Sequence, residues 1–165
     1  MILYIKRDIT DITSRFTVFD ETCTAEKYLV TGTHSAAGEK MQIVPANGSE
    51  VLLTIKKIPL PVLHTYSISD KKESIKLIVN NAGKTGTCYY YGISWRIRGT
   101  IETGSYDIVD ADNTVIASHI KRWSSCGDGF ELNVNNEDRE LFCIATAVCL
   151  NSFLAAEIPA VAVSS

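Results

Sequence analysis

The sequence predicts a mostly β protein of the α+β class, in which about twelve antiparallel strands close into a barrel around a buried C-terminal hydrophobic helix. Three observations support this prediction. Short segments with alternating apolar and polar residues recur about every ten residues. The middle of the chain repeats itself at a constant offset. One long segment near the C-terminus carries no charge.

The expected strands are runs of β-branched, aromatic or alternating residues that end at turn residues. The first six are Leu3–Lys6, Arg15–Phe19, Glu26–Thr31, Lys40–Val44, Glu50–Ile58 and His64–Ile68. The second six are Ser74–Val79, Cys88–Ser94, Arg96–Ile101, Ser105–Val109, Thr114–Trp123 and Phe130–Val134. Regular short strands of this kind are typical of sandwiches and barrels.

The breaks between these strands have the composition of turns. Asn47-Gly48 tolerates the positive φ angles of a tight hairpin, and DADN (Asp110–Asn113) is a similar turn. NNAGKTG (Asn80–Gly86) is the longest expected loop. In the segment Lys57–His64, Pro59 and Pro61 favour a stiff edge or crossover connection. A partner-binding segment is the alternative.

An internal repeat divides the chain into two similar halves, at about 1–79 and 87–134. Met41–Lys57 matches Tyr106–Arg122 without a gap at an offset of 65, so that Ile55 falls on Ile120. Two halves of about six strands each would close into a barrel without a free sheet edge. We therefore expect one domain that spans residues 1–165.

The uncharged segment is expected to be the central helix, at about 136–158. NNEDRE (Asn135–Glu140) provides an Asn cap and acidic residues for the first turn, and Pro159 marks the expected end. The uncharged stretch Leu141–Ala156 would span ~24 Å as a helix, which is short for a membrane. A barrel of twelve strands is too wide to be filled by its own side chains. The segment is therefore expected inside the barrel.

Composition narrows the function. A net charge of −3 argues against a nucleic-acid binder. A local basic face is still compatible with this net charge. The N-terminus lacks the pattern of a signal peptide, and Ile2 stands where myristoylation needs glycine. We therefore expect a cytoplasmic protein without a transmembrane segment.

No residue pattern indicates an enzyme, a metal site or a cofactor. The five cysteines show no CxxC or zinc spacing, and we expect free thiols, with a disulfide or redox role as the alternative. The histidines His34, His64 and His119 lie far apart in the sequence, so a catalytic or metal role would need the fold to bring them together with carboxylates. No nucleophile elbow, P-loop, dinucleotide or zinc-protease motif is present.

The pattern resembles the Tubby C-terminal-like superfamily and, within it, the LURP-one-related family, which is similar to phospholipid scramblases. The resemblance rests on FTVFDETCTAEKYLVTG (Phe16–Gly32), IVPANGSEVLLTIKK, HTYSI (His64–Ile68), IRGTIETGSYDIVDADNTVIASHIKR (Ile97–Arg122) and DRELFCIATAVCLNSFLAAE (Asp138–Glu157). It implies a barrel without known catalytic residues. Tubby relatives bind phosphoinositides through basic surface residues, and scramblase relatives act at membranes, but no family site maps onto particular positions here.

Basic residues provide the candidate binding site. Repeat-equivalent pairs stand at Lys56-Lys57 and Lys121-Arg122, and Arg96 and Arg98 lie on one face of a strand. Such residues suit phosphate headgroups, while the alternative is that they are solvated outward positions.

We accordingly expect a non-enzymatic barrel that binds acidic phospholipid headgroups at the membrane surface. A protein-interaction scaffold without lipid affinity is the alternative, and an unrecognised enzyme is a third.

Overall fold

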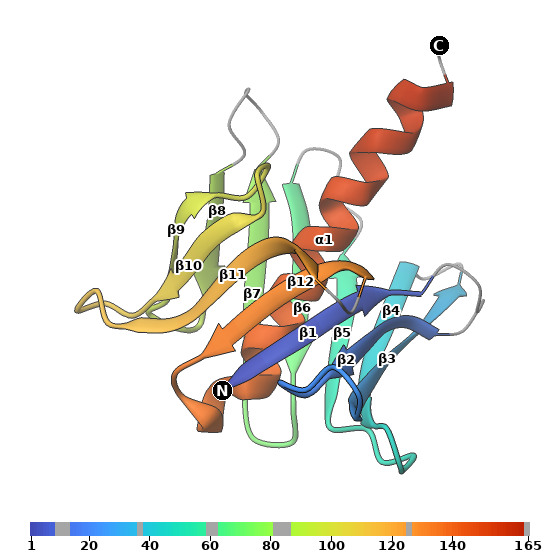
Figure 1. Ribbon diagram of the computed structural model, residues 1–165. Helices are drawn as coiled ribbons and strands as arrows, with labels where there is room; N and C mark the ends of the chain where they lie inside the picture. Colours follow the sequence, from blue (N-terminus) through green and yellow to red (C-terminus); the bar gives the residue numbers. More distant parts are fainter. Residues whose placement is uncertain (9–13, 36–37, 59–62, 81–86, 125–126, 164–165) are drawn as a thin grey trace.

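Twelve strands and one long helix make up the computed structural model, which describes residues 1–8, 14–35, 38–58, 63–80, 87–124 and 127–163 (Figure 1). The strands are β1 (Ile2–Arg7), β2 (Ser14–Phe19), β3 (Glu26–Ser35), β4 (Gly38–Pro45), β5 (Leu53–Ile58), β6 (Leu63–Ser69), β7 (Ser74–Asn80), β8 (Thr87–Tyr91), β9 (Arg96–Thr100), β10 (Ser105–Val109), β11 (Val115–Ser124) and β12 (Gly127–Val134). A short 3-10 helix, η1 (Glu137–Arg139), leads into α1 (Glu140–Val163).

The strands form a closed antiparallel barrel, as the sequence predicts. Each strand pairs with its neighbours in the chain, and β1 closes the ring by pairing with β12. Every expected strand overlaps an observed one, and the differences lie at strand ends. For example, β5 begins at Leu53 instead of Glu50, and β12 begins at Gly127 instead of Phe130. Of the predicted loop Asn80–Gly86, Asn80 is the last residue of β7, and residues 81–86 lie outside the described residues. The two prolines at 59 and 61 also lie outside them.

The repeat offset relates β4, β5 and β6 to β10, β11 and β12. The hairpin of β4 and β5 nevertheless differs in register from the equivalent hairpin of β10 and β11. Met41 lies opposite Ile55, whereas its equivalent Tyr106 lies opposite His119. A bulge between Ile108 and Val109 shifts the second hairpin. Because a shift of one residue exchanges the faces of a strand, Ile55 is buried whereas Ile120 is 38% exposed.

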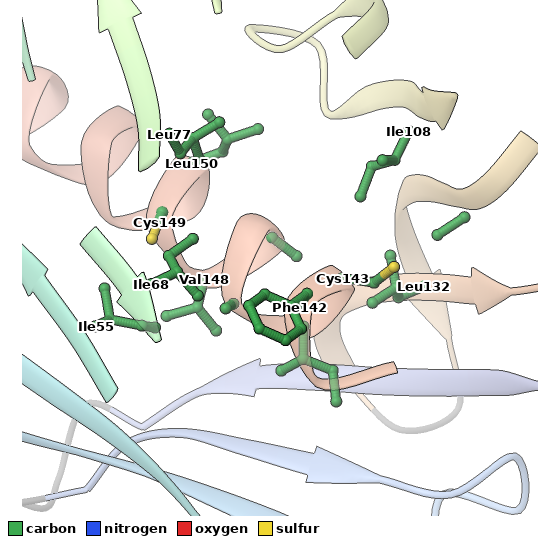
Figure 2. Packing of buried hydrophobic residues seen from close by; sticks show 14 of the residues in the cluster. Ile55, Ile68, Leu77, Ile108, Leu132, Phe142, Cys143, Val148, Cys149 and Leu150 are labelled. Carbon is green, nitrogen blue, oxygen red and sulfur yellow. The ribbon is translucent and has the colours of Figure 1, made fainter. Parts of the chain in front are cut away.

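The helix fills the barrel. Every residue from Phe142 to Asn151 is buried, and Figure 2 shows this segment surrounded by inward side chains of the strands. Ile55, Ile68, Leu77, Ile108 and Leu132 of the strands belong to the same core cluster as Phe142, Cys143, Val148, Cys149 and Leu150 of α1. The prediction of a buried central helix is confirmed for these turns.

The predicted start of the helical region is close, but the predicted end is wrong. The side chain of Asn136 accepts a hydrogen bond from the backbone N–H of Asp138 (3.2 Å) and caps η1. At the other end, α1 continues past Pro159 to Val163 and extends beyond the barrel (Figure 1). A proline removes one helical hydrogen bond, but alanines at 155, 156, 160 and 162 favour helix on both sides of it.

Ion pairs fix the first turn of α1 to the base of the barrel. Lys27 Nζ of β3 lies 2.6 Å from Glu140 Oε1, and the Tyr28 hydroxyl donates to Glu140 Oε2 (3.3 Å). Burial, together with the Glu140 carboxylate, raises the pKa of Tyr28 to about 12. On another side, Arg139 pairs with Glu73 in the turn between β6 and β7. These contacts set the position from which the helix rises into the barrel.

The cysteines follow the expectation of free thiols only in part. Cys143 and Cys149 are free and buried on α1, and Cys88 is free and half-buried on β8. Burial raises the pKa of the Cys88 and Cys143 thiols to about 12, so they act as core side chains and are poor nucleophiles. Cys23, in the turn between β2 and β3, is disulfide-bonded, so the expectation is wrong there.

Candidate functional site

Strand alternation decides which basic side chains reach the outer surface of the barrel. On β5, Leu53 and Ile55 point into the core, and Lys56 between Ile55 and Lys57 is exposed. Lys57 follows the inward alternation, lies opposite the buried Tyr66 and is half-buried. The predicted pair Lys56-Lys57 is therefore divided between two faces of the wall.

Lys56 belongs to a row of outward residues that crosses four strands. Lys40 of β4 lies directly opposite Lys56, Lys56 lies opposite Ser67 of β6, and Ser67 lies opposite Lys76 of β7. We call Lys40, Lys56, Ser67 and Lys76 the basic row. At ~4.8 Å between neighbouring strands, the row extends over ~14 Å. Tyr91 of β8 lies opposite Lys76 and ends the row.

The basic row has no counter-charge in the described part of the chain. The ion pairs given by the described residues involve none of its three ammonium groups. The described outward positions of β4 to β8 also carry no carboxylate. Like charges directly opposite each other destabilise a sheet, so the Lys40–Lys56 pair is unfavourable unless an anion lies between the two side chains. The arrangement is thus suited to binding phosphate or carboxylate groups.

The predicted arginines have protein partners. Arg98 Nη2 donates to Asp107 Oδ2 of β10 (2.9 Å), and Arg96 donates to the side-chain oxygen of Asn113. Asp107 also accepts from Ser118 Oγ of β11 (2.7 Å). The hydrogen bond from Ser118, with Arg98 contributing, lowers the pKa of Asp107. Arg98 is therefore committed to a cross-strand network on β9, β10 and β11.

The second predicted basic pair, Lys121-Arg122, lies on another side of the molecule. Lys121 is exposed on β11, and the side chain of Arg122 lies outside the described residues. In the ring of twelve strands, β5 and β11 are six positions apart, so they occupy opposite walls. The repeat therefore separates Lys56-Lys57 from Lys121-Arg122. Sequence reasoning missed Lys40 and Lys76, although both occupy the polar position of an alternating run, in EKMQI and SIKLI.

A second basic surface lies at β1 and β2. Lys6, Arg7, Thr17 and Phe19 line a shallow hollow there together with Asp8. The Lys6 ammonium lies 5.5 Å from the centre of the Phe19 ring. Because a carboxylate shares this hollow and Lys6 is engaged by an aromatic ring, the basic row is the better candidate for an anion.

His64 and His119 do not form a site with each other in the described structure, and the side chain of His34 lies outside the described residues. His119 is buried on β11, where Nδ1 donates to the Gly104 carbonyl (2.7 Å) and the ring stacks on Tyr106. Burial lowers the pKa of His119 to about 4. His64 packs against Phe153 of α1. Among the described residues, no three side chains of the types that bind metals converge.

The molecule is a closed twelve-stranded antiparallel barrel with a helix in its centre and the basic row on its wall. The chain belongs to the LURP-one-related family, whose model matches residues 1–151, and the predicted resemblance is confirmed. The chain is 24% identical over 153 residues to Uncharacterized protein YxjI of Bacillus subtilis (strain 168), covering 92% of this chain and 93% of that protein. No solved structure matches.

The helix in the barrel does not suggest a membrane span. No helix in the described residues has both the length and the apolar character to cross a bilayer.

Proposed function

We propose that this protein is a non-enzymatic barrel that binds the phosphate groups of acidic phospholipids at a membrane surface through the basic row. The observation that carries the proposal is the row itself: Lys40, Lys56 and Lys76 are exposed, unpaired among the described residues, and set on a wall without outward carboxylates. The protein would then be cytoplasmic and peripheral, with no resident cofactor.

Charge explains why the contact would use this wall. The whole chain carries a net charge of −3, so an anionic surface repels the molecule in most orientations. Each lysine close to an anionic membrane contributes about 1 kcal/mol of binding free energy. Three lysines on one wall would therefore supply about 3 kcal/mol in the single orientation that presents the row. Added salt would weaken the contact, since the Debye length shrinks from ~10 Å at 0.1 M to ~3 Å at 1 M.

Vesicle binding tests the proposal. The protein should co-sediment with phosphatidylserine or phosphoinositide vesicles and not with phosphatidylcholine vesicles, and salt should release it. Replacing all three lysines of the row by glutamate should weaken binding by roughly 100-fold or more, because three favourable terms are lost and three repulsive ones are added.

The matched control makes the same change in charge on other strands, with Lys6, Arg7 and Lys121 replaced by glutamate. This control should bind nearly as well as the unmodified protein, and thermal unfolding should show that both variants are folded. Equal binding to anionic and neutral vesicles, or equal losses in the two triple variants, would contradict the proposal.

The second candidate function is a protein-interaction scaffold without lipid affinity. The observation that favours it is the pair of exposed tyrosines on the same wall, Tyr89 and Tyr91, because tyrosine is enriched at protein interfaces. A specific protein partner that competes for this wall, with no binding to any vesicle, would favour the scaffold. An enzymatic role rests on no arrangement of side chains in the described structure.

A further inference from the structure

A second outward row lies beside the basic row and has the opposite character. Ile58 of β5 lies opposite Thr65 of β6, Thr65 lies opposite Ile78 of β7, and Ile78 lies opposite Tyr89 of β8. Thr65 is polar and buried (5% exposed), so the apolar surface of the row comes from Ile58, Ile78 and Tyr89. We call these four residues the apolar row. It runs two residues along each strand from the basic row, a separation of ~7 Å. Arg96 of β9, opposite Tyr89, ends it.

The tyrosines of β8 are the most prominent apolar feature of the described surface. Tyr89 is 45% exposed and Tyr91 is 70% exposed, and both point outward because Tyr90 between them is buried. Among the described residues, the other exposed large hydrophobic side chains are Met1 at the N-terminus (37%) and Ile120 on β11 (38%). Aromatic exposure is thus concentrated at the β8 end of both rows.

We propose that Tyr89 and Tyr91 enter the headgroup region of an anionic bilayer while the basic row contacts its phosphates. This inference rests on the proposed function and specifies its ligand as an intact membrane surface. Tyrosine has an apolar ring and a polar hydroxyl, and such side chains settle at the boundary between headgroups and hydrocarbon. The half-buried Ile58 and Ile78 extend the apolar surface behind them.

The dimensions of the basic row favour a membrane surface as the ligand, in preference to a single soluble phosphate. One phosphate can lie between Lys40 and Lys56, which are direct neighbours across the sheet. Lys76 lies two strands further on, at ~10 Å from Lys56, and would contact a different headgroup. A flat array of headgroups matches this spacing and also covers the tyrosines. A free phosphate ion would leave both Tyr89 and Tyr91 in water.

The test replaces Tyr89 and Tyr91 by serine and leaves all lysines in place. Binding to vesicles of phosphatidylserine and phosphatidylcholine should weaken about tenfold, whereas the dependence on salt should be unchanged. Ile120→Ser removes a hydrophobic residue of similar exposure from the opposite wall and should bind normally. Inorganic phosphate added at millimolar concentration should compete poorly, because it cannot replace the tyrosine contacts.

A second variant makes the test independent of the stability of the serine variant. In Tyr91→Trp, the indole fluorescence should be quenched by lipids brominated near the headgroup, more strongly than in the unmodified protein. Normal binding by the double serine variant, or no added quenching in Tyr91→Trp, would overturn the inference and leave the lysine contact standing. Failure of the unmodified protein to bind anionic vesicles would overturn the proposed function and the inference together.

Discussion

His119 shows how one residue acquires its properties from its place on a strand. The bulge between β10 and β11, where Ile116 of β11 is the extra residue, accompanies a register that turns His119 into the core and Ile120 out of it, the reverse of what the repeat predicts from Ile55. Inside the barrel, the ring lies between Tyr106 and Phe130, with centroids at 4.5 Å and 5.0 Å. Removal from water disfavours the charged imidazolium, which is why its pKa falls to about 4.

This pKa predicts a dependence of stability on pH. The folded pKa of about 4 lies below the ordinary 6.5, so the unfolded chain binds the extra proton between these values. The contribution is therefore fully present above pH ~6.5 and is lost as the pH falls toward 4, by about 3 kcal/mol in all. Urea unfolding gives the free energy of unfolding at pH 7.5 and at pH 4.5. The difference between these two free energies should be smaller for His119→Phe than for the unmodified protein. Identical differences would contradict the buried neutral state.

At the scale of elements, α1 is the part on which the whole barrel depends. Its buried turns include alanines at 145 and 147, which are fully buried. Such positions leave no room for a larger or charged side chain, because core packing is as dense as in organic crystals. The first turn is held by Lys27–Glu140 and Arg139–Glu73, so α1 is fixed at its base and packed along its length within the barrel.

A charge in the middle of α1 should therefore abolish folding. Ala147→Asp buries a carboxylate without a partner, and the cost of several kcal/mol is comparable to the whole stability of a domain. The variant should be aggregated or unfolded in circular dichroism and size-exclusion chromatography. Ala111→Asp makes the same substitution at an exposed turn and should fold normally. A folded Ala147→Asp protein would show that α1 is not the core.

The strands and the helix could be predicted because their signals are local. Alternation located all twelve strands, and the uncharged segment located the buried turns of α1. The end of α1 at Val163 could not be predicted from Pro159, since neighbouring alanines outweigh one proline. The register of β10 and β11 could not be predicted either, because the bulge at Ile108 and Val109 leaves no clear mark in the sequence.

At the scale of the whole molecule, ring closure decides which basic residues meet. The repeat suggested one site from Lys56-Lys57 and Lys121-Arg122, yet equivalent strands of two halves stand on opposite walls of a closed barrel. Lys40 and Lys76 join Lys56 only through the strand register, which relates residues far apart in the chain. The sequence therefore singled out Lys56, and the fold brought Lys40 and Lys76 into one row with it.

The most direct measurement of the central claim is paramagnetic NMR of the isotope-labelled protein on phosphatidylserine bicelles that carry a headgroup spin label. Amide signals of Lys56, Lys76, Tyr89 and Tyr91 should broaden, while those of Ser118 and Lys121 on the opposite wall should stay sharp. No broadening should occur on bicelles of phosphatidylcholine alone. Broadening centred on β10 to β12, or none on anionic bicelles, would contradict the proposal that the β4–β8 wall binds the membrane.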